Sequence, residues 1–88
     1  MTGPLPNGPL PNGPPPTVLD CRGQRCPLPV IMLARALPGV EVGATVRVIA
    51  DDPAAAVDIP AWCRMRGHGY LGAAEVDGLP AHDVRRDS

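Results

Sequence analysis

The chain has 88 residues, with 8 Arg, no Lys, 9 acidic side chains and a formal net charge of −1. This length allows one small domain and excludes a multidomain enzyme. The charge balance leaves no basic footprint for nucleic acid or for an anionic membrane surface. Trp62 and Tyr70 are the only aromatic residues, which argues against the base-stacking platform of a single-strand binder.

Residues 1–16 differ in composition from the rest of the chain. They hold 7 of the 13 Pro and 3 of the 10 Gly, and no charged side chain. The unit Gly-Pro-Leu-Pro-Asn begins at Gly3 and is repeated from Gly8. Because Pro removes backbone donors and Gly adds chain entropy, we expect a disordered, partly polyproline-II tail. We interpret it as an inert extension, with a ligand for a Pro-binding module as the alternative, and assign the domain to residues 17–88.

The first half of the domain predicts a strand followed by a helix. Residues 17–20 form a short β-type run, and Gly23 marks a turn. Pro is tolerated only in the first helical turn, so the helix should begin at about Pro27 with Cys26 as its N-cap. Pro38-Gly39 should end it. Its core face is predicted from helical spacing to consist of Val30, Leu33, Ala34 and Leu37.

The second half predicts a strand, a divided helical region and a hairpin. Residues 44–50 read as a largely buried strand, and Asp51-Asp52-Pro53 as a helix start with a first turn over 54–57. Because Pro60 should not continue a helix from upstream, Asp58-Ile59-Pro60 is interpreted as a second start, with an end at 67–69. Strands over 70–76 and 79–86 flank the hairpin turn Asp77-Gly78.

The order β-α-β-α-β-β predicts an α+β fold. We expect a two-layer α/β sandwich, with two helices packed on one face of a four-stranded mixed sheet. The chain has three cysteines, and an odd number argues against a pure disulfide framework. No apolar run is long enough to cross a bilayer, and no signal peptide is recognisable, so we expect a cytoplasmic protein with reduced thiols.

Cys26 is the residue with the clearest chemical potential. At a helix N-cap its thiol would face unpaired backbone N–H groups, which favour the thiolate. Arg22 and Arg25 add positive potential, so we expect a lowered pKa. Pro27 and Pro29 would stiffen the turn that presents the sulfur. A reactive thiolate without a base or a deep cleft indicates exchange chemistry with another protein.

The other cysteines and the histidines suggest less. Cys63, on an apolar face shared with Ile59 and Trp62, is interpreted as a core residue, and Cys21 as mainly structural. A zinc site would need Cys21, Cys26, Cys63 and His68, and we do not favour it. No metal is expected. His68 and His82 form no catalytic constellation, and His68 is interpreted as a solvated loop residue.

The first helix also carries a candidate docking surface. Opposite its core face lie Leu28, Ile31, Met32 and Arg35. Three of these four side chains are apolar on a face that should meet solvent beside Cys26. Such a patch usually marks a protein–protein contact, although a neighbouring loop could cover it.

The stretch Leu19-Asp20-Cys21-Arg22-Gly23-Gln24-Arg25-Cys26-Pro27-Leu28-Pro29 resembles the LDxxGxxCPxP motif of TusA-like (SirA-like) sulfur-carrier proteins. Ala50-Asp51-Asp52-Pro53, then Asp58-Ile59-Pro60-Ala61-Trp62-Cys63 and Gly67-His68, are similar to the family's second motif. The resemblance covers residues 18 to about 86. It implies the same β-α-β-α-β-β sandwich.

The resemblance also implies a sulfurtransferase role. Cys26 would accept sulfane sulfur as a persulfide from a cysteine desulfurase or rhodanese-type donor, and pass it to a relay protein without a cofactor. The pathways implied are tRNA thiolation, molybdenum-cofactor assembly and sulfur metabolism. Arg22 and Arg25 would stabilise the anionic sulfur, and Asp51, Asp52 and Arg35 are candidate docking charges. Two alternatives remain: a non-catalytic regulatory module that binds a protein, and a thiol redox switch through Cys21 and Cys26.

Overall fold

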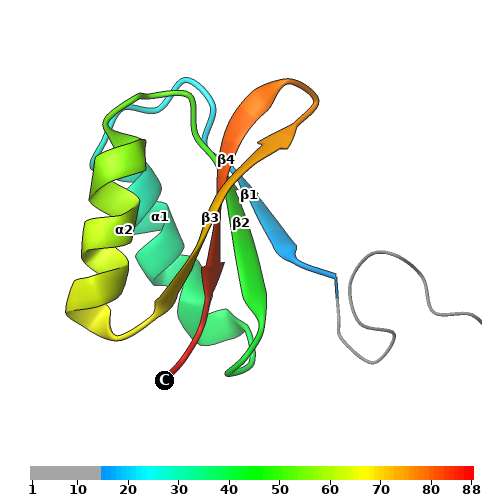
Figure 1. The fold of residues 1–88 in the computed structure, drawn as a ribbon, viewed down its shortest axis with the longest axis vertical. Helices are drawn as coiled ribbons and strands as arrows, with labels where there is room; N and C mark the ends of the chain where they lie inside the picture. The colour runs from blue at the N-terminus through cyan, green and yellow to red at the C-terminus, as the bar shows by residue number, and fades with distance from the viewer. Residues whose placement is uncertain (1–14) are drawn as a thin grey trace, which may run out of the picture.

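The protein is described by a computed structural model that covers residues 15–88. Two helices lie on one face of a four-stranded sheet (Figure 1). The elements in chain order are β1 (Thr17–Asp20), α1 (Leu28–Ala36), a 3-10 turn η1 (Leu37–Gly39), β2 (Thr45–Ile49), α2 (Ala55–Arg66), β3 (Gly69–Val76) and β4 (Leu79–Arg85). The predicted β-α-β-α-β-β order and the two-layer sandwich are confirmed.

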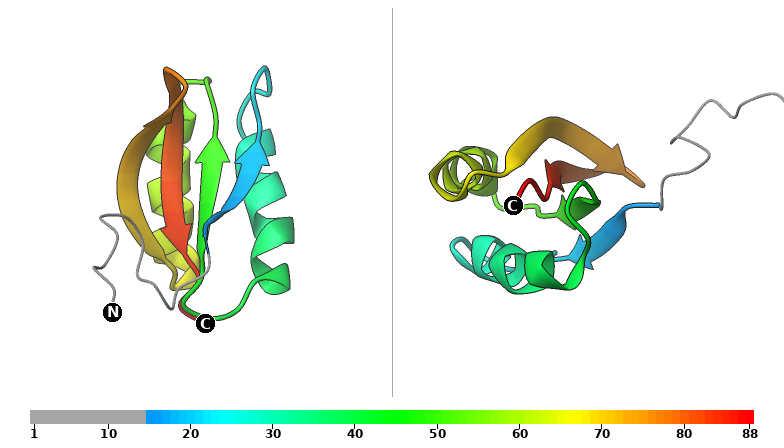
Figure 2. Two further views of the ribbon diagram at one scale, coloured as in Figure 1. Left: turned by 90° about the vertical axis from the view of Figure 1, so that its right-hand side faces the viewer. Right: turned by 90° about the horizontal axis from the view of Figure 1, so that it is seen from below.

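The sheet is mixed and has the strand order β1-β2-β4-β3. β1 and β2 are parallel because the chain crosses over through α1 between them. β4 pairs antiparallel with both β2 and β3. Seen from the side and from below, both helices stay on the same side of the sheet (Figure 2). Within residues 15–88, no helix covers the opposite face of the sheet.

The core lies between the sheet and the two helices and is aliphatic. Val46, Val48 and Val84 of the sheet are 0 % exposed, as are Leu33 of α1 and Ile59 of α2. Burying each such side chain stabilises the fold by roughly 1.5–3 kcal/mol. Since no large aromatic side chain fills the centre, the two layers depend on close contact between branched aliphatic residues.

Helix α1 begins one residue later than expected. Its N-cap is Pro27, so the prediction of Cys26 as the N-cap is wrong, and Cys26 lies just before the cap. The core face is also shifted, because Pro29, Leu33 and Leu37 are buried at i, i+4 and i+8. Ala34, which was expected in the core, is exposed on the flank of this row. Pro29 is therefore a core residue in the first helical turn.

Helix α2 is continuous, which contradicts the expected break before Pro60. Proline inside a helix removes one backbone hydrogen bond and costs roughly 3 kcal/mol. Ala55, Ile59 and Cys63 occur at i, i+4 and i+8, and all three are at most 1 % exposed. These three residues share one buried face only if the helix continues through Pro60. The free energy gained by burying this face offsets the cost of the proline. Trp62 packs against the same core, as predicted.

The turns follow the expected chemistry. α2 ends at Gly67, which has a left-handed φ of 76°, and the amide of His68 donates to the carbonyl of Cys63 at 2.9 Å. The β3–β4 hairpin turns at Asp77 and Gly78, whose φ values are 50° and 78°. The expected strand limits differ from the observed ones by at most one residue at either end.

The prediction for residues 1–16 lies, apart from Pro15 and Pro16, outside the described residues. Among residues 15–88, neither helix has the length and hydrophobicity needed to cross a lipid bilayer.

Candidate functional site

Cys26 lies in the segment of residues 21–27, here called the Cys26 loop, which joins β1 to α1. At the top of Figure 1 this loop runs beside the segment that joins β2 to α2. The two segments are tied together by Asp52, whose carboxylate accepts hydrogen bonds from the amides of Cys26 at 2.9 Å and Ala54 at 3.0 Å. Asp51 accepts from the amide of Gly23 at 3.0 Å. Both carboxylates therefore hold the Cys26 loop in place, and their predicted docking role stays a prediction.

The three cysteines differ in burial. Cys21 is 0 % exposed and Cys63 is 1 % exposed, and both belong to the core. The interpretation of Cys63 as a core residue is confirmed, and Cys21 is likewise buried. Cys26 is only partly buried and packs against the edge of the core. Cys26 is thus the one thiol within residues 15–88 that a macromolecular partner could reach without unfolding.

The electrostatics of Cys26 contradict the expected lowering of its pKa. Burial, followed by a hydrogen bond from the thiol to the Asp58 carboxylate and by the charges of Asp58 and Asp52, raises the pKa of Cys26 to about 11. The resting thiol is therefore protonated at neutral pH. The expectation failed because it weighed nearby arginines in sequence, whereas the groups nearest in space are carboxylates on and before α2.

Arg22 and Arg25 do not act on the resting sulfur as predicted. Arg22 forms a two-pronged ion pair with Asp20, with N–O distances of 2.6 and 2.8 Å. Its guanidinium is thereby engaged by a carboxylate that precedes the loop. Arg25 lines a shallow depression of ≈ 460 Å³ together with Gly23, Gln24, Asp51, Asp52 and Pro53. Neither arginine is among the groups that shift the pKa of Cys26.

The exposed face of α1 has the predicted character. Leu28, Ile31 and Met32, here called the apolar patch, are 48 %, 39 % and 36 % exposed. All three belong to α1, whose first residue, Leu28, lies two positions after Cys26. Arg35 is exposed at the other end of this helix. Exposed apolar side chains beside a reachable thiol suit contact with another protein. Their role in docking stays a prediction.

The histidines and the considered zinc set are arranged differently from expectation. His68 is not simply solvated: its ring stacks on Trp62 with 5.5 Å between centroids, and its Nδ1 accepts from the amide of Asp87. His82 is 5 % exposed and shares a 2.9 Å hydrogen bond with the hydroxyl of Tyr70. Within residues 15–88, no three His, Cys, Asp or Glu side chains are gathered as metal ligands would be.

Asp58 is the site residue that sequence reasoning missed. It was considered only as a helix start, and it does lie in the first turn of α2. Its contact with Cys26 joins residues 32 positions apart, and no local pattern announces such a contact. The available signal was its place in the second motif of the resemblance, next to Ile59 and Pro60.

Within residues 15–88, this two-layer α+β domain places its reachable thiol just before α1. The arrangement suits thiol chemistry at the surface of a small domain. Residues 17–81 match the family described as sulfurtransferase TusA, and the chain belongs to this family. It is also similar to the crystal structure of a SirA-like protein from Desulfitobacterium hafniense, with 26 % sequence identity and a TM-score of 0.69. That match covers 82 % of this chain and 99 % of the other. The chain is therefore a member of a sulfur-transfer family.

Proposed function

We propose that this protein is a sulfur carrier, which takes up sulfane sulfur as a persulfide on Cys26 and passes it to an acceptor protein. The observation that carries the proposal is the contrast among the cysteines: Cys26 is partly exposed, while Cys21 and Cys63 are buried in the core. Membership of the family supports sulfur transfer in general. The persulfide, the attacking residue and the direction of transfer are our inference.

The loading step is an exchange between sulfur atoms. The Cys26 thiolate attacks the terminal sulfur of a donor persulfide, R–S–SH. A new S–S bond forms on Cys26, and the donor's S–S bond breaks with its electron pair leaving on the donor thiolate. Cys26 then carries –S–SH. In the delivery step an acceptor thiolate attacks that terminal sulfur and Cys26 leaves as a thiolate. Neither step consumes an external oxidant or reductant.

Asp58 supplies the control of the proton in this scheme. The carboxylate accepts the thiol hydrogen bond and contributes to the pKa of about 11, so at neutral pH only about one molecule in 10⁴ carries the thiolate. A partner that places a positive charge near Asp58 would offset both effects and favour the thiolate. Deprotonation is thereby coupled to docking, and the unbound carrier keeps a thiol that resists oxidation.

The partners follow from this chemistry. The donor is a protein persulfide, such as that of a cysteine desulfurase or a rhodanese-type enzyme, and the acceptor is a relay protein with a thiol. The apolar patch borders the sulfur and supplies apolar area for such contacts. Delivery in the cytoplasm to tRNA thiolation, molybdenum-cofactor assembly or sulfur metabolism remains part of the proposal. No cofactor enters any step.

Peptide mapping tests the assignment without any substitution. The chain has no Lys, and its arginines place the three cysteines in separate tryptic peptides: residues 1–22 contain Cys21, 26–35 contain Cys26, and 48–64 contain Cys63. After incubation with a desulfurase, cysteine and a blocking step, we expect a gain of about 32 Da on peptide 26–35. Sulfur found mainly on either of the other two peptides would overturn the proposal.

A substitution checks that the labelled cysteine also transfers. Cys26→Ser should abolish the transfer of radioactive sulfur from a loaded donor to the carrier. Cys63→Ala is the matched control, because it removes a thiol from the same domain and leaves Cys26 in place. Retained uptake in Cys26→Ser would mean that another residue takes the sulfur and would overturn the assignment to Cys26. Full function of Cys26→Ala in cells would favour the regulatory alternative. The redox-switch alternative would require Cys21, which is 0 % exposed, to pair with Cys26, and it predicts a loss of function in Cys21→Ser.

A further inference from the structure

The side-chain charges of this protein are separated between its two ends. All of them lie within residues 20–87, so the structure places each one. Both helices begin at the end that holds the Cys26 loop, and the β3–β4 hairpin turns at the same end (Figure 1). This end is here called the thiol end, and the end where the helices finish is called the far end. The ion pair of Arg47 with Asp83 lies in the middle of the sheet and is neutral as a whole.

The thiol end is strongly acidic. The hairpin is fixed to it through the sheet, because Glu75 is in register with Pro80, whose carbonyl accepts from the amide of Ala50 at 3.1 Å, one residue before Asp51. Six acidic side chains lie at this end against two arginines, which leaves a net side-chain charge of −4. The acidic residues are Asp20, Asp51, Asp52, Asp58, Glu75 and Asp77, and the arginines are Arg22 and Arg25.

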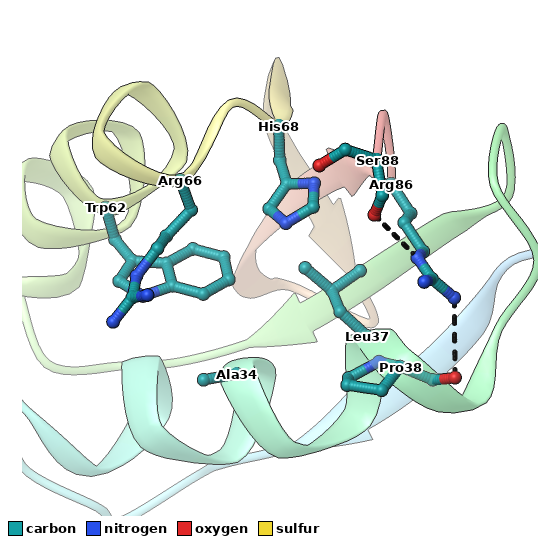
Figure 3. A pocket seen from close by; sticks show the side chains of 8 residues that line it. All are labelled: Ala34, Leu37, Pro38, Trp62, Arg66, His68, Arg86 and Ser88. Atoms are coloured by element: carbon teal, nitrogen blue, oxygen red, sulfur yellow. Dashed lines mark hydrogen bonds between the residues drawn. The ribbon is translucent and has the colours of Figure 1, made fainter.

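The far end carries the opposite charge. Five arginines lie there against two acidic side chains, which leaves a net side-chain charge of +3. The arginines are Arg35, Arg64, Arg66, Arg85 and Arg86, and the acidic residues are Glu41 and Asp87. Figure 3 shows two of these arginines, Arg66 and Arg86, around a hollow of ≈ 370 Å³ that Leu37 and Trp62 also line. A chain with a formal net charge of only −1 is therefore strongly polar along the direction of its helices.

Helix stabilisation explains only part of this separation. Acidic side chains are favourable at a helix N-terminus and basic ones at its C-terminus. Asp58 in the first turn of α2 and three of the far-end arginines in the last helical turns fit that rule. Glu75 and Asp77 belong to no helix, and both are exposed. The ion pairs within residues 15–88 join Arg22 to Asp20, Arg47 to Asp83 and Arg85 to Asp87, so neither hairpin carboxylate is paired. The fold therefore gives no reason for their charge, which suits binding.

We propose that the thiol end docks on a positively charged surface of the sulfur donor, with the apolar patch at the centre of the contact and the carboxylates around it facing Lys and Arg. The inference rests on the proposed function and names the chemistry of its partner. An apolar centre with a polar rim is the usual anatomy of such a contact, and complementary potentials speed its formation. Because the same donor surface repels the far end, the field also turns Cys26 toward the donor.

Three short peptides test the field at Cys26 without a choice of donor. Each has one cysteine in a mixed disulfide with thionitrobenzoate, and they carry four Arg, four Glu or four Ser. The Cys26 thiolate attacks the peptide sulfur, the S–S bond breaks, and thionitrobenzoate leaves as a coloured thiolate. At an ionic strength of about 0.01 M, where the Debye length is about 30 Å, the Arg peptide should react about tenfold faster than the Glu peptide. At about 1 M the difference should vanish. Equal rates at low salt, or a faster Glu peptide, would overturn the proposal.

Paired substitutions separate the position of the charge from its total. Glu75→Gln with Asp77→Asn removes two negative charges from the thiol end, and Glu41→Gln with Asp87→Asn removes two from the far end. All four side chains are exposed, and none is among the groups that shift the pKa of Cys26. The first pair should slow the reaction with the Arg peptide about threefold at low salt, whereas the second should leave its rate unchanged. Neutral iodoacetamide should alkylate both variants at the rate of the unchanged chain. Equal slowing by the two pairs would contradict a role for the thiol end.

Sulfur uptake from a loaded desulfurase checks the donor itself. Its rate should fall as the ionic strength rises, and the substitutions at the thiol end should lower it. A rate that salt does not change, or that rises with salt, would overturn this docking mode. Sulfur on the tryptic peptide of residues 26–35 would still support the carrier function in that case, so the two proposals can fail separately.

Discussion

Replacing Asp58 by Asn tests the control of the Cys26 proton directly. Asparagine keeps the size and an acceptor oxygen but removes the negative charge. The rise in the pKa of Cys26 from 9.0 to about 11 disfavours the thiolate by about 3 kcal/mol. Burial is the largest single cause and Asp58 contributes the next two, so we take the share of the carboxylate as about half of this, or roughly 1.4 kcal/mol. Asp58→Asn should therefore raise the thiolate fraction at neutral pH about tenfold.

The expected gain in reactivity is smaller than the gain in thiolate. Nucleophilicity falls with pKa with a Brønsted coefficient of about 0.4–0.5, so the rate of alkylation at neutral pH should rise roughly threefold. In the assay, the folded protein is alkylated with iodoacetamide at a series of pH values, and the label is then measured on the tryptic peptide of residues 26–35. Losing an acidic side chain from the first turn of α2 should also cost about 0.3–1 kcal/mol of stability. Thermal unfolding measures that cost separately.

The matched control is Asp77→Asn. Asp77 has a φ of 50°, a conformation that Asn adopts readily, and its carboxylate is not among the groups that shift the pKa of Cys26. This control removes the same charge and should leave the alkylation profile unchanged. An Asp58→Asn profile that superimposes on that of the unchanged protein, or moves to higher pH, would refute the role of Asp58.

Three further outcomes are expected. Gly67→Ala should lower the free energy of urea unfolding by about 1–2 kcal/mol, because Gly67 has a left-handed φ. Gly39→Ala, whose added Cβ meets no atom within 4 Å, should be nearly neutral, and equal losses of stability would contradict this. Burial lowers the pKa of His82, so the unfolded state binds its proton more tightly, and stability should fall as pH drops below about 6.5; His82→Gln should remove this part of the slope. Ile31→Asp should slow sulfur uptake from a desulfurase without lowering Tm. Met65→Asp, at a more exposed apolar site away from the apolar patch, should not slow it. Equal slowing by both would argue against the apolar patch as the docking surface.

Local patterns in the sequence were reliable where the structure depends on neighbouring residues. The strand of residues 45–49, the hairpin turn at Asp77-Gly78 and the Gly67 cap follow from β-propensity and from left-handed turn chemistry, which act over a few residues. The local rule that proline ends a helix failed for Pro60. Burial of the face that extends along the whole of α2 outweighed the cost of this one residue. The N-cap assignment failed by a single position, because Pro27 itself takes the cap.

In the candidate site, too, the features set by neighbouring residues were predicted, and the features set by contacts between distant residues were not. The partial exposure of Cys26, the exposure of the apolar patch and the burial of Cys63 were predicted from helical spacing and from the residue types around them. The influence of Arg22 was misjudged, because its closeness in sequence to Cys26 says nothing about its ion pair with Asp20. The hollow between Leu37, Trp62 and Arg86 was not anticipated, since it forms where the ends of two helices and the segment after β4 converge.

The sequence by itself determined the order of elements, the class of fold and which cysteine lies at the start of the first helix, because hydrophobic period, proline position and turn chemistry are encoded within a few neighbouring residues. Only the tertiary structure decided the protonation state of that cysteine. Asp52 holds its amide from 26 positions away, and Asp58 faces its sulfur from 32. An electrostatic environment depends on distances in space, and these exist only once β2 and α2 have packed beside the Cys26 loop.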